Sequence, residues 1–73
     1  MTSEEKNQVY AAVMDSVNLI NKLVAEDSLD KEDKDTISRN VEHIEIIIAK
    51  PYWTEDDNLD PLKSAIIAGK SIL

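Results

Sequence analysis

Residues 37–48 read Ile-Ser-Arg-Asn-Val-Glu-His-Ile-Glu-Ile-Ile-Ile, and this stretch decides the fold class of the 73-residue chain. Its apolar residues recur at spacings of three and four, which is typical of one face of a helix: Ile37, Val41, Ile44 and Ile48. The last isoleucines also alternate with period two, and isoleucine favours strands, so a strand remains the alternative. Because the sequence contains no second strand for it to pair with, the pattern favours a helix.

The boundaries of this helix follow from the residues around it. The Asp30 carboxylate can cap free N–H groups, and Glu32 and Asp33 favour the positive end of the helix dipole. Pro51 ends the helix because the residue before proline avoids helical dihedral angles. Near its C-terminal end this helix is apolar over most of its circumference. A single neighbouring helix cannot cover so wide an apolar surface.

A first helix precedes it. Thr2 and Glu5 form a capping-box pattern, which predicts a helix start near Ser3. An apolar stripe then recurs at spacings of four and three, and it consists of Val9, Val13, Val17, Ile20 and Val24. Leu23 lies alongside this stripe, and Tyr10 and Met14 widen it. The charged stretch at residues 26–30 predicts the break between the two helices.

A third, shorter helix begins at one of two places. Thr54 with Asp57 repeats the capping pattern, whereas Asp60-Pro61 offers a start with proline in the first turn. Gly69 is the predicted stop. We therefore predict an all-α fold in one domain, residues 1–73, with an antiparallel hairpin of two helices followed by a short C-terminal helix.

The small size of the domain predicts self-association. A chain this short buries only about 60% of the surface that it exposes when unfolded. It has no cysteine for a disulfide, and one histidine cannot build a zinc site. Ile, Val and Leu number 20, too many for one small core. We expect a homo-oligomer, a tetramer or larger.

The charge balance limits the classes of partner. Eight Lys and Arg against 15 Asp and Glu give a formal charge of −7, which repels long nucleic acids and anionic membranes. No apolar run approaches the roughly 20 residues of a membrane span, and residues 1–5 lack the basic start of a signal peptide. We expect a cytoplasmic protein in which dispersed cations still form local positive pockets.

Residues 50–54, Lys-Pro-Tyr-Trp-Thr, interrupt the helical pattern and contain the only tryptophan. Flat side chains beside a cation can stack on a base or another planar ligand, and Pro51 stiffens the backbone that presents them. The alternative is structural: Tyr52 and Trp53 fold back to cap the core, with their polar atoms bound to water or to a carbonyl. The two interpretations are compatible.

Catalytic and metal-binding motifs are weak. Asp56, Asn58 and Asp60 match the first positions of a calcium loop, but Pro61 replaces its glycine and Ile67 its glutamate. His43 has no serine motif beside it. Arg39 and His43 lie four residues apart and can share a phosphate, although a solvated flank is the commoner meaning of such a pair. We expect neither an enzyme nor a metal site.

The second half of the chain resembles a recurrent family of short proteins from tailed phages. The resemblance rests on Asn40-Val41-Glu42-His43-Ile44-Glu45, Ala49-Lys50, Trp53-Thr54-Glu55-Asp56 and Ala65-Ile66-Ile67-Ala68-Gly69. The chain is also similar to the anti-CBASS sponges, small helical phage proteins that assemble as oligomers and sequester cyclic dinucleotide immune signals. This resemblance implies an anti-defence protein that binds such a signal in the host cytoplasm without degrading it.

A cyclic dinucleotide needs stacking surfaces for two bases and cations or N–H donors for two phosphates. Candidates for stacking are Tyr52, Trp53 and Tyr10, and those for phosphate are Lys50, Arg39, His43, Thr54 and Lys70. The N-terminus of the third helix is a further anion site, but the acids after Thr54 repel phosphate and favour an approach from the Arg39 side. The alternatives are an acidic module that inhibits a host protein, or an accessory phage protein without a small-molecule ligand.

Overall fold

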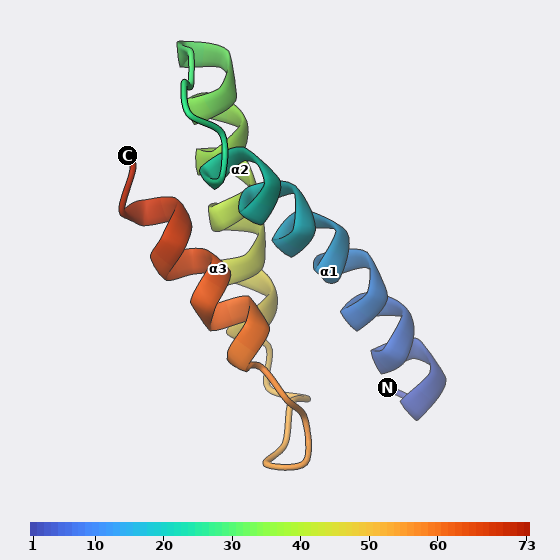
Figure 1. Ribbon diagram of the computed structural model, residues 1–73. Coiled ribbons are helices and arrows are strands. Elements are labelled where there is room, and N and C mark those ends of the chain that lie inside the picture. The colour runs from blue at the N-terminus through green and yellow to red at the C-terminus, as the bar shows by residue number, and fades with distance from the viewer.

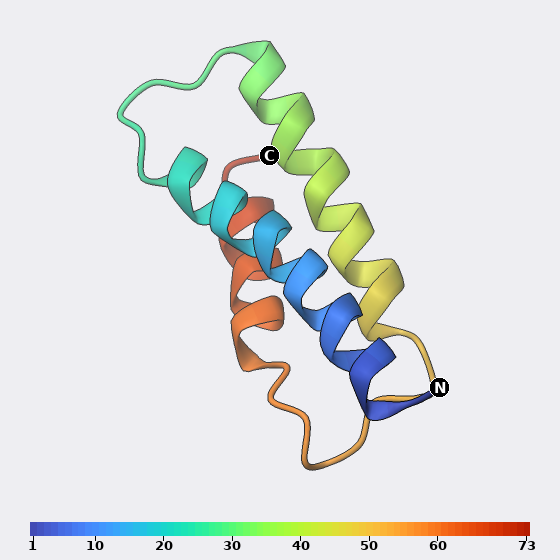
Figure 2. The ribbon, with the colours of Figure 1, turned by 90° about the vertical axis from the view of Figure 1, so that its right-hand side faces the viewer.

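The computed structural model describes all 73 residues as three helices and contains no strand. The helices are α1 (Ser3–Val24), α2 (Lys31–Ile48) and α3 (Asp60–Lys70). α1 and α3 run in one general direction and α2 runs in the other (Figures 1 and 2), and every pair of helices is in contact. The predicted hairpin and C-terminal helix therefore close into an elongated bundle of 41 × 17 × 16 Å. None of these helices is both long and apolar enough to cross a membrane.

Side-chain caps fix the starts of α1 and α2 as predicted. Thr2 Oγ1 accepts the Glu5 N–H at 3.1 Å, and the Glu5 carboxylate accepts the Thr2 N–H at 3.4 Å, which completes the capping box. Asp30 Oδ1 accepts the Asp33 N–H at 2.8 Å at the start of α2. Each cap satisfies N–H groups that have no partner inside the helix.

The start of α3 is the second of the two predicted places. Thr54 and Asp57 do form the expected capping hydrogen bonds, but these close an isolated turn. A helix that began at Thr54 would carry Pro61 in its interior, where the ring cannot donate a hydrogen bond and meets the preceding turn. Starting α3 at Asp60 places Pro61 in the first turn, where its missing N–H is harmless.

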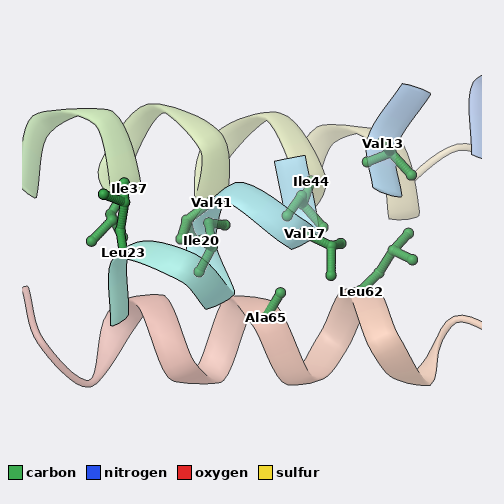
Figure 3. Close-up of a cluster of buried hydrophobic side chains, with 9 residues drawn as sticks. All are labelled: Val13, Val17, Ile20, Leu23, Ile37, Val41, Ile44, Leu62 and Ala65. Atoms are coloured by element: carbon green, nitrogen blue, oxygen red, sulfur yellow. The ribbon is translucent and has the colours of Figure 1, made fainter. Parts of the chain in front are cut away.

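The core lies where the inner faces of the three helices meet (Figure 3). α2 provides the predicted Ile37, Val41 and Ile44, and the side chains of Leu62 and Ala65 point from α3 toward those of the other two helices. The residues from α1 come from the predicted stripe and its flank: Val13, Val17, Ile20 and Leu23. Val9 and Val24 at the ends of that stripe are only half-buried.

The alternative of a strand near Ile48 is excluded by the geometry of α2. Ile44 is fully buried, whereas Ile46 is 53% exposed and Ile48 is half-buried. A strand would place all three side chains on one face. The 100° turn per helical residue separates Ile46 from the other two, so the period of two in the sequence is incidental.

Gly69 does not end the third helix, so that prediction was wrong. Gly69 is buried inside α3, which continues to Lys70, and its φ angle is not positive. A Cβ atom at this position would lie 2.5 Å from Val41 Cγ2 and 3.2 Å from Ile37 Cγ2. The glycine is therefore there for close packing of α3 on α2.

Candidate functional site

Three aromatic rings that are distant in sequence meet at the end of the bundle where the loop of residues 49–59 joins α2 to α3. The ring centroids of Tyr52 and Trp53 lie 4.9 Å apart with a tilt of 57°. Tyr10, from α1, meets Trp53 edge-on at 6.2 Å and 72°. Such edge-to-face pairs are favourable because the positive edge of one ring meets the negative face of the other. Tyr10, Tyr52 and Trp53 form the aromatic cluster.

Two polar atoms of the aromatic cluster are bound within the chain. Trp53 Nε1 donates to the carbonyl of Ile47 at 2.8 Å, and Tyr10 Oη donates to the carbonyl of Asn58 at 2.8 Å. The Ile47 carbonyl, in the last turn of α2, also accepts the Lys50 N–H at 3.1 Å, so Trp53 is its second donor. The cluster therefore holds the loop against the end of α2. The Trp53 N–H does reach a carbonyl, as the structural alternative predicted, but of the three rings only Tyr10 packs against the core.

Lys6 is a second anchor for the loop, and it was not among the predicted site residues. Its ammonium donates to Asp57 Oδ2 at 2.9 Å and to the carbonyl of Tyr52 at 3.4 Å. The pKa of Asp57 lies below its ordinary value of 3.8, first because of the hydrogen bond from Lys6 and then because of the backbone hydrogen bond from Thr54. Lys6 therefore ties the start of α1 to both halves of the loop.

Thr54 lies in an acidic setting that does not favour phosphate. Its N–H and hydroxyl both point to Asp57 Oδ2, at 2.8 and 3.3 Å. The surface depression beside it, of about 410 Å³, is lined by Glu55, Asp56 and Asp60 among others. No group of three His, Cys, Asp or Glu residues there or elsewhere is arranged to hold a metal ion.

The N-terminus of α3 is also poorly suited to an anion. The Asp60 N–H is bound by the side chain of Asn58 at 3.1 Å, and Pro61 has no N–H. An anion site at a helix start needs several free N–H groups that point at the ligand. The prediction of a phosphate site at this helix start therefore has no support in the geometry.

Two cations and a histidine lie along one side of α2. Arg39 and His43 are exposed and lie one turn apart on this helix, and exposed Lys50 follows just beyond its end. Neither Arg39 nor Lys50 has an ion-pair partner. His43 Nδ1 lies 3.4 Å from the hydroxyl of buried Ser16 on α1, which orients the imidazole. Arg39, His43 and Lys50 form the basic face.

Lys70, the remaining predicted phosphate ligand, lies apart from both groups. Its ammonium donates to Glu45 Oε2 at 3.0 Å across the α2–α3 contact. Both side chains are about half exposed, at 56% for Lys70 and 44% for Glu45. Of the eight predicted residues, the fold thus groups three as the aromatic cluster and three as the basic face, and it leaves Thr54 and Lys70 elsewhere.

A third surface feature is a shallow groove of about 530 Å³ between α2 and α3, which we call the seam. Its lining is mainly apolar and consists of Glu45, Ile48, Ala49, Lys63, Ile66 and Ile67. The side chain of Ile67 is 71% exposed. The surplus of aliphatic residues indicated an open apolar surface, but only the packing of α3 on α2 shows where that surface lies.

The chain matches no protein-family model, no curated protein and no solved structure.

Proposed function

We propose that this chain is a non-enzymatic binding protein that sequesters a cyclic dinucleotide immune signal as part of a phage anti-defence system. The proposal rests on the resemblance of its second half to small phage proteins and sponges. It requires cations for two phosphates and flat surfaces for two bases. The basic face supplies cations along the second half of α2, and the half-buried rings of Tyr52 and Trp53 supply stacking surfaces beside Lys50, roughly 16 Å along the helix from Arg39.

The observation that carries the proposal is the set of unpaired cations on one helix face. In a chain of formal charge −7, Arg39 and Lys50 have acids available throughout the sequence but form no ion pair with any of them. An exposed, unpaired guanidinium is well suited to bidentate binding of a phosphate. The protein therefore presents a local positive surface against a negative background, which favours a small anion over a long polyanion.

The proposed pocket is completed by self-association. The groove between α2 and α3 and the depression beside Thr54 are both shallow, and neither is lined by the basic face. Small-molecule sites bury most of the ligand surface in a concave pocket. In the proposed assembly, a neighbouring copy supplies the opposite wall.

Thermal unfolding with a panel of nucleotides tests this function. A ligand that binds only the folded state raises the midpoint, by at least about 10 °C at a hundredfold excess over Kd. We expect this shift with one cyclic dinucleotide and not with mononucleotides. We expect Arg39→Ala/Lys50→Ala to lose the shift and Lys22→Ala, an exposed lysine on α1, to retain it. No shift across a saturating panel, or an equal shift in the double variant, would contradict the proposal.

The fate of the ligand separates a sponge from an enzyme. After incubation with excess protein and heat denaturation, a sequestered cyclic dinucleotide is recovered intact by chromatography. Release of linear dinucleotide or mononucleotides would show hydrolysis instead. A catalytically inactive preparation of a known phosphodiesterase is the matched control for loss by adsorption.

A second candidate is an acidic module that binds and inhibits a host protein. It is favoured by the exposed carboxylates Glu55, Asp56 and Asp60 around one depression. Association with a basic partner through these acids slows as salt screens the charges. Glu55→Gln/Asp56→Asn would weaken such a complex and leave nucleotide binding unchanged, which distinguishes the two functions.

A further inference from the structure

The seam between α2 and α3 has the composition of an interface core. Ile48 and Ile66 are half-buried in the seam, and Ile67 beside them is 71% exposed. Ile48 and Ile66 pack against the core on their inner side, and the rest of these side chains faces outward into the groove. Contiguous apolar surface with a charged border is characteristic of a contact site.

The charges that border the seam are sorted by helix. Glu45 lies on α2, and Glu42 is exposed one turn before it. Lys63 and Lys70 lie on α3, and Lys63 has no ion-pair partner. One edge of the seam is therefore acidic and the other is basic. The Glu45–Lys70 ion pair joins the two edges within the chain, so Lys63 is the cation at this border that is left without a partner.

We propose that a second copy of this chain docks on the seam, with a two-fold axis running along the groove between α2 and α3. This axis places α2 of each copy opposite α3 of the other. Glu45 then faces Lys63 of the second copy, the reciprocal pair forms by symmetry, and the isoleucines of the two copies meet at the centre. The contact is self-complementary, as closed two-fold interfaces require.

The charge pattern selects this arrangement over the other two-fold one. An axis across the groove would place α2 opposite α2, so that Glu45 would face Glu45 and Lys63 would face Lys63. Like charges that face one another across an interface are unfavourable. A standard interface takes about 800 Å² from each partner, about one sixth of the 4922 Å² of accessible surface here. The contact therefore extends along one long side of the molecule.

The first experiment measures molar mass by light scattering during size exclusion, from about 1 µM to about 1 mM protein. We expect a multiple of 8.2 kDa for the native chain. Ile67→Asp should raise the dissociation constant at least tenfold, because it places a charge in the apolar centre. Leu19→Asp, on the exposed side of α1, is the control and should leave the mass unchanged. A native monomer up to 1 mM, or an Ile67→Asp variant of unchanged mass, would overturn the proposal.

A charge-exchange experiment tests the pairing itself. Glu45→Lys and Lys63→Glu should each weaken self-association, because each places like charges opposite one another twice. In an equimolar mixture, Lys at 45 of one variant faces Glu at 63 of the other, and the native Glu45 and Lys63 form the second pair. We expect the mixture to recover the native mass. A mixture no larger than its components would overturn the arrangement, and circular dichroism of each variant excludes unfolding.

This inference goes beyond the proposed function, because none of the basic-face residues lines the seam. Its experiments contain no nucleotide, so they give their answer whether or not the chain binds one. If the native chain assembles but binds no nucleotide, the proposed function is contradicted and the proposed docking on the seam stands. If the chain is a monomer that still shows a nucleotide-dependent shift in the unfolding midpoint, the docking on the seam is contradicted and nucleotide binding stands.

Discussion

The loop at residues 49–59 and the seam differ in how far their side chains are bound or buried within the chain. The loop contains the residues that stand out in the sequence, yet its tryptophan N–H is bound to the Ile47 carbonyl and its acid Asp57 is bound to Lys6. The apolar part of the seam consists mainly of ordinary isoleucines, yet Ile67 is the most exposed of the large hydrophobic side chains, at 71%. Conspicuous residues can thus be structural, while inconspicuous ones are left open for contact.

Trp53→Ala is the substitution with the largest expected effect on this comparison. It removes two ring contacts and the hydrogen bond to the Ile47 carbonyl, at a cost of about 2–3 kcal/mol of unfolding free energy. Urea unfolding measures this loss, and Trp53→Phe should lose less than half as much because it retains a ring. Native-like stability of Trp53→Ala would mean that the loop is not anchored by this residue.

Gly69→Ala tests the inner face of α3, opposite the open seam. Alanine favours a helix by about 1 kcal/mol, but the added methyl meets Val41 Cγ2, and overpacking costs about 1–3 kcal/mol. We expect a net loss of up to about 2 kcal/mol by thermal unfolding. The double variant Gly69→Ala/Val41→Ala should cost less than the sum of the two single variants, because Val41→Ala makes room. An increase in stability for Gly69→Ala would show that Val41 and Ile37 shift to accommodate the added methyl group at little cost.

Tyr10→Phe examines one anchor of the loop. It removes the hydrogen bond to the Asn58 carbonyl and keeps the ring beside Trp53, so we expect a loss of about 1 kcal/mol. Tyr52→Phe is the matched control, because the Tyr52 hydroxyl donates no hydrogen bond within the chain, and it should have little effect. Equal losses in the two variants would point to the rings and not to the hydroxyl of Tyr10.

Asp57 gives the loop a pH dependence. Because its pKa is lowered in the folded state, its ionised form contributes stability above the unfolded pKa, and this contribution is lost as pH falls through the folded value. We expect the stability difference between the native chain and Asp57→Asn to be constant above about pH 5 and to shrink below about pH 4. Unfolding of both proteins from pH 2 to 7 measures it. A difference that stays constant into acid would remove Asp57 from the anchor.

The smallest effect is expected beside the seam. The Lys70–Glu45 ion pair is about half exposed, so Lys70→Ala should change the unfolding free energy by less than about 0.5 kcal/mol. The measurement is urea unfolding at dilute protein, where self-association does not contribute. A loss above 1 kcal/mol would mean that the pair holds α3 on α2.

Local signals in the sequence predict the helices well, because each signal acts within a few residues. Thr2 with Glu5 and the Asp30 carboxylate mark helix starts through hydrogen bonds three residues apart. Pro61 is also a local signal, and it decides between the two starts of α3 once its missing N–H is considered.

Contacts between distant segments could not be predicted in the same way. Lys6 and Asp57 are 51 positions apart, and nothing in either neighbourhood indicates the other. Gly69 has the same sequence context as a helix stop, and only the approach of Val41 shows its packing role. The aromatic cluster was foreseen as a group of residues, but its attachment to α1 and to the end of α2 depends on how the helices pack.

The position of Trp53 makes its intrinsic fluorescence a reporter of whether the loop is attached to the helices. Its indole, the only one in the chain, lies between two tyrosines and donates to a backbone carbonyl. Intrinsic fluorescence should therefore shift to the red when the loop detaches, and tyrosine-to-tryptophan energy transfer should fall with it. The seam includes Ile48 and Ala49, directly after the Ile47 carbonyl that Trp53 binds, so a change in emission on dilution through the association range would show that docking at the seam reaches the loop.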